Sequence, residues 1–62
     1  MTLRELQVGD RFRHEAKRGR FYQVTAEKCI FNSGHGSSTR LCWCEHSKKW
    51  VSKSCNLKVV KL

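Results

Sequence analysis

The chain has 62 residues and a formal net charge of +8, from 13 lysines and arginines against five acidic residues. A chain of this length forms one domain, over residues 1–62, and buries only about 60% of the surface that its unfolded form exposes, so its core must be small. No stretch approaches the roughly 18 apolar residues of a membrane span, and the N-terminal residues hold no apolar signal segment, which argues against a membrane protein and predicts a cytoplasmic one.

The first half of the chain predicts a helical turn followed by a β-hairpin. Leu3 and Leu6 suit one turn or 3₁₀ segment over 2–6, which a Val-Gly-Asp sequence then ends. Beyond it the apolar period changes to two, so we expect strands over 10–14 and 20–26, joined by a polar, glycine-bearing loop.

The second half predicts further short strands, over 29–31, 39–46, 50–55 and 57–62, the last as a strand or as a 3₁₀ turn followed by a strand. Segment 32–38 has two glycines, three serines and no apolar residue, which predicts a mobile exposed loop. Five or six short antiparallel strands with closely spaced turns favour an all-β fold, a small SH3-like or OB-like barrel, because closure removes exposed strand edges.

A family resemblance rests on the apolar residues of these elements. The sequence resembles the small SH3-like β-barrel proteins of bacteriophages and prophages in Leu3-x-x-Leu6-x-Val8-Gly9-Asp10-x-Phe12, Phe21-Tyr22-x-Val24, Trp50-Val51-Ser52 and Leu57-x-Val59-Val60-x-Leu62. These residues maintain a fold and perform no chemistry. The resemblance therefore implies an architecture and a phage origin, and it implies no activity.

The stretch Leu41–His46 raises the question of a metal site. On a strand, Cys42, Cys44 and His46 share one face, while Leu41, Trp43 and Glu45 share the other. In a reducing cytoplasm we expect the four cysteines to be buried hydrophobic side chains or metal ligands rather than disulfides. The favoured interpretation places Cys42 and Cys44 inward, with Trp43 partly exposed beside a turn.

Two alternatives to this structural role stay open. A zinc ion needs four nitrogen or sulfur ligands, and here the fourth would come from Cys55 or Cys29, although no Cys-x₂-Cys pair is present. A redox or regulatory thiol is the other alternative, since nearby lysines and arginines lower the pKa of a cysteine. We expect neither a metal nor a cofactor.

The sequence contains no recognisable catalytic arrangement. There is no phosphate-binding glycine motif and no pair of carboxylates, and nothing places His14 or His35 beside a nucleophile. We therefore expect no enzyme and no catalytic residue.

The basic residues form two groups. Arg11, Arg13, Lys17, Arg18 and Arg20 fall in the first hairpin, which we interpret as a phosphate clamp, and a second group consists of Lys48, Lys49 and Lys53. The second group lies close in sequence to Trp43 and Trp50, and cations interleaved with aromatic rings suit nucleic acid. Against this, most of the six aromatic residues, including Phe21, Phe31 and Trp50, are expected inside a core that has few other large side chains.

The charge predicts an anionic partner. A strongly positive field destabilises a compact chain, and nucleic acid, DNA or RNA, is the partner that such a field fits best. A basic surface that only keeps the protein soluble is the other interpretation of the charge. We expect a nucleic-acid-binding module with little base selectivity. The alternative is an adaptor or inhibitor that docks on a host protein through the Gly/Ser loop and the Trp43 face, with charge speeding the encounter.

Overall fold

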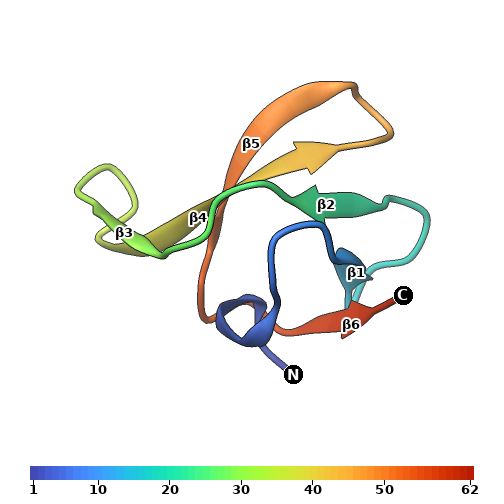
Figure 1. Cartoon of the computed structure of the whole chain (residues 1–62), viewed down its shortest axis with the longest axis horizontal. Coiled ribbons are helices and arrows are strands. Elements are labelled where there is room, and N and C mark those ends of the chain that lie inside the picture. The colour runs from blue at the N-terminus through green and yellow to red at the C-terminus, as the bar shows by residue number, and fades with distance from the viewer.

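The computed structural model describes all 62 residues and shows one six-stranded antiparallel sheet with a single 3₁₀ turn (Figure 1). The elements are η1 (Leu3–Glu5), β1 (Arg11–His14), β2 (Tyr22–Val24), β3 (Ile30–Asn32), β4 (Ser37–Cys44), β5 (Lys49–Ser54) and β6 (Val59–Lys61). The all-β prediction, the first hairpin and the N-terminal turn are confirmed. No helix is long or apolar enough to cross a membrane.

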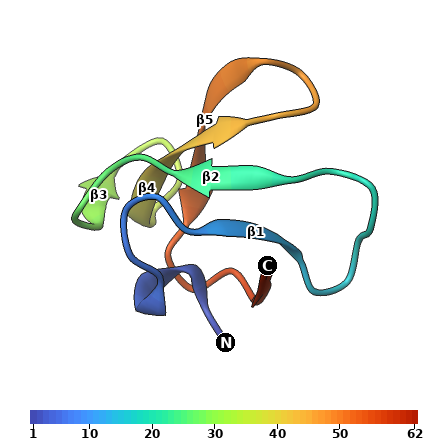
Figure 2. The same ribbon diagram turned by 45° about the vertical axis from the view of Figure 1, so that its right-hand side comes forward.

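Strand β4 organises the sheet. On one side of β4, its N-terminal half pairs with β3 and its C-terminal half pairs with β2, while β5 pairs along its other side. The strand order is therefore β3-β4-β2-β1-β6, with β5 paired to β4 alone. Strand β5 has no second partner, so the sheet is not closed. The β1–β2 loop and the β4–β5 turn project from the same end of the molecule, and the β3–β4 turn lies at the other end (Figures 1 and 2).

The segment predicted as a mobile exposed loop, 32–38, is longer than the exposed turn that the structure shows over 33–36, so the prediction is wrong in its extent. Asn32 ends β3 and Ser37 begins β4, which leaves only a turn between them. The Asn32 side chain accepts a hydrogen bond from the backbone of Gly34 at 3.0 Å, and Gly36 has a φ of 68°, which suits glycine. Ser33 and the two glycines thus belong to a tight turn, whereas Ser37 and Ser38 belong to β4.

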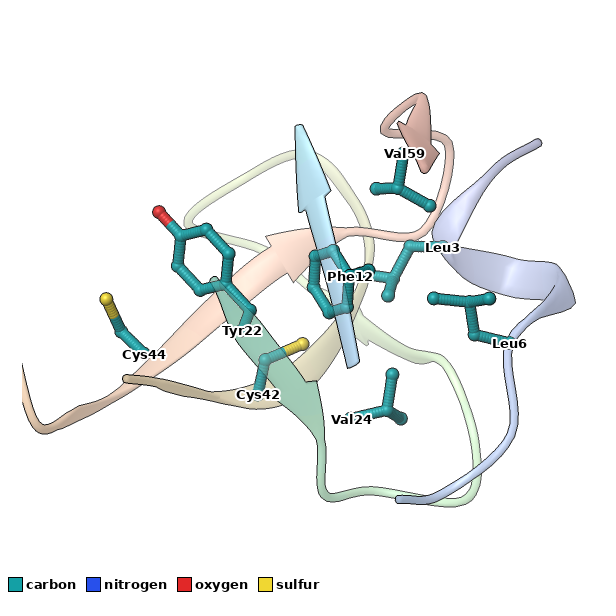
Figure 3. Close-up of a cluster of buried hydrophobic side chains, with 8 residues drawn as sticks. All are labelled: Leu3, Leu6, Phe12, Tyr22, Val24, Cys42, Cys44 and Val59. Carbon is teal, nitrogen blue, oxygen red and sulfur yellow. The ribbon is translucent and has the colours of Figure 1, made fainter. Parts of the chain in front are cut away.

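The core lies on the concave face of the sheet (Figure 3). Phe12 and Tyr22 stack with ring centroids 5.4 Å apart, and the Cys42 sulfur points toward Phe12, while Tyr22 and Cys44 lie at the end of the cluster away from Leu6. The cluster consists of Leu3, Leu6, Phe12, Tyr22, Val24, Cys42, Cys44 and Val59. The members that lie on strands follow a period of two along each strand, which is why alternate positions could be predicted to face inward.

One charged side chain, Arg40, is buried beside this core, 4% exposed. Its guanidinium donates hydrogen bonds to the carbonyl oxygens of Leu3 (3.0 Å) and Leu6 in the N-terminal turn, and of Ala26 (2.8 Å) and Glu27 (3.3 Å) after β2. The buried charge is thus solvated by backbone carbonyl groups, and it joins two segments that no strand pairing connects.

Cys29 and Cys55 form a disulfide with a Cα–Cα distance of 6.3 Å. The expectation that all four cysteines are buried thiols or metal ligands is therefore wrong for this pair. Cys29 precedes β3 and Cys55 follows β5, and their proximity arises because both strands pair with the N-terminal half of β4. The spacing of 26 residues gives no local signal for this bond.

Candidate functional site

A pocket of about 230 Å³ lies between the β1–β2 loop and β5. Its lining contains three charged residues of the loop, one lysine of β5, and two ring side chains from the adjoining strands, and it contains no carboxylate. We call this the cationic pocket; it is lined by His14, Lys17, Arg18, Arg20, Tyr22 and Lys53.

The sheet brings these residues together from three elements. His14 ends β1 and Tyr22 begins β2, and both line the pocket together with residues of the loop that connects them. In that loop Gly19 has a φ of 103°, a conformation that residues with a side chain rarely adopt. Lys53 reaches the same place from β5, where it points inward like Val51. Its Nζ lies 5.0 Å from the centroid of the Tyr22 ring, within the range of a cation–π interaction.

His14 contributes a buried polar atom to the pocket. Its Nε2 has no hydrogen-bond partner, and its ring lies 5.4 Å from that of Tyr22. Burial lowers the pKa of His14, and the charges of Lys53 and Lys17 lower it further. The imidazole is therefore neutral at pH 7 amid uncompensated positive charge, and an anion in the pocket would favour its protonation.

Two arginines of the predicted clamp have partners elsewhere. Arg11 forms a two-pronged ion pair with Glu45, at 2.7 and 2.8 Å, which raises the pKa of Arg11 and lowers that of Glu45. Arg13 donates a hydrogen bond from Nη1 to the backbone oxygen of His14 at 3.0 Å. The side chain of Arg11 lies on the convex face, so it does not face the pocket.

The eight basic residues predicted to bind are therefore divided. Lys48 lies in the β4–β5 turn and Lys49 begins β5, at the same end of the molecule as the β1–β2 loop (Figure 2), but neither lines the pocket. The structure brings Lys17, Arg18, Arg20 and Lys53 together and leaves Arg11, Arg13, Lys48 and Lys49 outside.

The site predicted from the sequence lacks His14 and Tyr22. A signal is present for both, because each lies an even number of residues from an inward side chain, His14 from Phe12 and Tyr22 from Val24. That alternation places them on the concave face, where Lys53 also points.

The cysteines of β4 face inward, as the favoured interpretation predicted. Cys42 and Cys44 are buried, and burial raises the pKa of the Cys42 thiol to about 11. Burial also raises the pKa of Cys44, but hydrogen bonds from Ser47 and from the His46 backbone outweigh it, so that this pKa is lowered overall. His46 itself lies exposed in the β4–β5 turn, and no three potential metal ligands lie together.

Most aromatic residues are outside the core, which corrects the expectation that they fill it. Only Phe12 and Tyr22 are buried, whereas Phe31 is 67% exposed and Trp50 is 62% exposed. The short strands give the small core too little room for large rings. Phe21 is also exposed, beside the guanidinium of Arg11, which lies 5.8 Å from its ring centroid.

The convex side of β4 and β5, together with Phe21 directly before β2, carries a patch that we call the aromatic face; it consists of Phe21, Leu41, Trp43 and Trp50. Trp43 and Trp50 are directly paired across the two strands, with ring centroids 4.8 Å apart at an interplanar angle of 67°. Trp43 is half-buried by this contact. The sheet therefore separates two surfaces, a cationic one on its concave side and an aromatic one on its convex side.

No protein-family model matches the chain, and neither a curated protein nor a solved structure matches it. Its function must therefore be inferred from the two surfaces. Of these, the cationic pocket has the more specific chemistry, because four cations converge on one cavity without a neutralising acid.

Proposed function

We propose that the protein is a small nucleic-acid-binding module that holds phosphate groups in the cationic pocket. The observation that supports this most is the position of Lys53, which comes from a different part of the chain and joins the three cations of the β1–β2 loop. Like charges brought together without an acid destabilise a fold, and a bound polyanion would reverse that cost.

The pocket offers phosphate the donors that it binds best. Arg18 and Arg20 carry planar guanidinium groups that can give two parallel hydrogen bonds to phosphate oxygens, and Lys17 and Lys53 add point charges. Contacts to phosphate fix the position of a strand without reading its bases, so the proposed binding has little base selectivity. Release of condensed counterions would drive it, and affinity would fall steeply with salt.

The type of β-fold and the phage origin of the protein are part of the same proposal. The curved sheet, its short strands and its N-terminal turn are consistent with an incompletely closed SH3-like barrel, and the residues of the phage-type resemblance include the core members Leu3, Phe12 and Val59. We propose a phage-type protein. The Cys29–Cys55 bond does not support the cytoplasmic location expected from the sequence, since disulfides persist mainly in oxidising compartments.

Removal of pocket charge tests the function. Arg18→Gln with Arg20→Gln removes two charges from the pocket, and Lys28→Gln with Lys58→Gln removes two exposed charges outside it. Fluorescence anisotropy with a labelled 12-nucleotide strand, titrated from about 50 to 200 mM salt, gives affinity and salt slope. We expect the pocket variant to lose most binding and to flatten the slope by about 1.4, at about 0.7 per phosphate contact.

The matched control decides whether the pocket or the net charge is responsible. The Lys28/Lys58 variant has the same net charge and should retain nearly the full slope. Equal losses in the two variants would show a diffuse field and contradict a pocket. Absence of binding by the unchanged protein at about 50 mM salt would contradict the function itself.

A second candidate, an adaptor that docks on a host protein, is favoured by one observation. Ile30 and Phe31 are 69% and 67% exposed on β3, a strand that projects from the body of the molecule (Figure 1). Exposed apolar side chains of this kind mark contact surfaces. A pull-down from bacterial lysate with and without nuclease separates the candidates, because a protein partner would survive nuclease and the Arg18/Arg20 change.

A further inference from the structure

The aromatic face leaves one indole ring open to a ligand. Trp50 contacts Trp43 at an angle and is still 62% exposed. A cross-strand aromatic pair stabilises a hairpin, which is the ordinary reason for its presence. That contact uses only part of the Trp50 ring, and the remainder offers a flat surface that water solvates poorly.

Strand β5 connects this ring to the cationic pocket. Lys53 and Trp50 are three residues apart on β5, about 10 Å at roughly 3.3 Å per residue. Their side chains lie on opposite faces of the sheet, but β5 has a free edge, so the two faces meet there with no further strand between them. A flexible chain can therefore pass from the pocket over this edge to Trp50.

The charges along that path fit an anionic chain. Lys49 is exposed next to Trp50 on β5, and Lys48 lies exposed in the adjoining turn. Glu45, which directly follows β4, is already paired with Arg11. A polyanion held at Lys53 would thus meet two further lysines and an exposed ring toward the start of β5.

We propose that the ligand is single-stranded nucleic acid, with a phosphate in the cationic pocket and a nearby base stacked on Trp50. This rests on the proposed function and adds the strandedness of the ligand. Bases of a single strand are free to stack on an aromatic ring whatever their sequence, whereas the faces of bases in a duplex are already stacked on one another. The structure therefore favours an unpaired strand.

The experiment compares three probes of equal length: a single strand of mixed sequence, its duplex, and an abasic strand with the same phosphates. Trp50→Leu keeps an apolar contact with Trp43 but removes the stacking plane, and Phe31→Ala removes an equally exposed ring on β3 as a control. We expect Trp50→Leu to weaken single-strand binding by about 5- to 150-fold, the range for one stacked base. Binding of the abasic strand and of the duplex should not change.

Trp50 fluorescence distinguishes stacking of a base from a change in the fold caused by the substitution. In a Trp43→Phe background, Trp50 is the single tryptophan, and its emission should be quenched by the single strand and not by the abasic strand. Circular dichroism confirms that each variant is folded. Equal affinity for single strand and duplex, with no effect of Trp50→Leu, would overturn the inference while leaving the pocket function intact. In that case only the Arg18/Arg20 variant would lose binding, and Trp50→Leu would retain it.

Discussion

Arg40 links the sheet to the N-terminal turn, because its guanidinium donates to carbonyl groups of both η1 and the β2–β3 connection. An arginine is charged at any working pH and carries five donors in a rigid fork, so it can satisfy several acceptors at once. Burial of such a charge is costly without these acceptors. Its contribution is therefore to fold stability rather than to the cationic surface.

We predict that Arg40→Met lowers the free energy of unfolding by roughly 2–4 kcal/mol, since it leaves several buried carbonyl oxygens without donors. Arg40→Lys should cost less than Met but not restore stability, because an ammonium lacks the fork. Urea unfolding measures both variants, and Lys28→Met at an exposed position is the control. Equal stability of Arg40→Met and the unchanged protein would contradict this role.

At the scale of single residues, the sequence indicates to which face of the sheet a side chain points, but it does not indicate which distant residues that side chain contacts. Alternation along β4 is enough to predict that Cys42 and Cys44 face inward, because a side chain's face depends only on its own strand. The same alternation places Arg40 inward, but its acceptors lie 13 to 37 residues away, and no local pattern indicates them. Neither of the two basic groups defined from the sequence includes Arg40.

At the scale of elements, β3 and β5 depend on each other through Cys29 and Cys55. Both strands flank β4, on opposite sides, and no backbone hydrogen bonds join them directly. The disulfide closes a loop of 26 residues between them. A covalent bond there restricts the unfolded chain, which compensates in part for the small core.

Reduction of this bond should lower the free energy of unfolding by about 2–4 kcal/mol, the usual range for a native disulfide. Thermal unfolding with and without dithiothreitol measures the effect, and Cys29→Ser with Cys55→Ser should reproduce it. Alkylation of the denatured, unreduced protein should modify only Cys42 and Cys44. Modification of all four cysteines would show that the bond does not form.

Six strands can be located from the sequence within a few residues, because alternation and turn residues act locally. The pairing of β4 with three strands cannot, since it depends on contacts between distant segments. That pairing is also what brings Lys53 to the β1–β2 loop. Four of the six residues that line the candidate site therefore follow from the grouping of basic residues along the sequence, and their assembly into one pocket follows from the strand topology.

At the scale of the whole molecule, positive charge is unevenly compensated. Ion pairs tie Arg11 to Glu45 and Lys61 to Asp10, whereas the cationic pocket contains no acid. The three histidines lie in different places: His14 in the pocket, His35 in the β3–β4 turn and His46 in the β4–β5 turn. Only His14 would sense an anion held by the pocket.

This distribution of charge predicts that the affinity for nucleic acid depends on pH through the protonation of His14 alone. The lowered pKa of His14 keeps it neutral in the free protein, and a bound anion would raise that pKa, so binding takes up a proton. Affinity for an oligonucleotide without a terminal phosphate should therefore increase as pH falls from about 7.5 to 5.5, by at most about tenfold per pH unit for one proton. The groups that face His14 are Lys17, Arg18 and Arg20 of the loop, Tyr22 of β2 and Lys53 of β5.

His14→Gln should abolish most of this pH dependence, and His35→Gln and His46→Gln should preserve it. The stability of the free protein responds in the opposite sense: because the pKa of His14 is lower in the folded state, the unfolded chain binds the proton more readily below about pH 6.5, and stability decreases as the pH is lowered. Circular dichroism at each pH must therefore accompany the anisotropy titration. A dependence that persists in His14→Gln and disappears in His46→Gln would place the anion at the β4–β5 turn instead, beside Lys48 and Lys49.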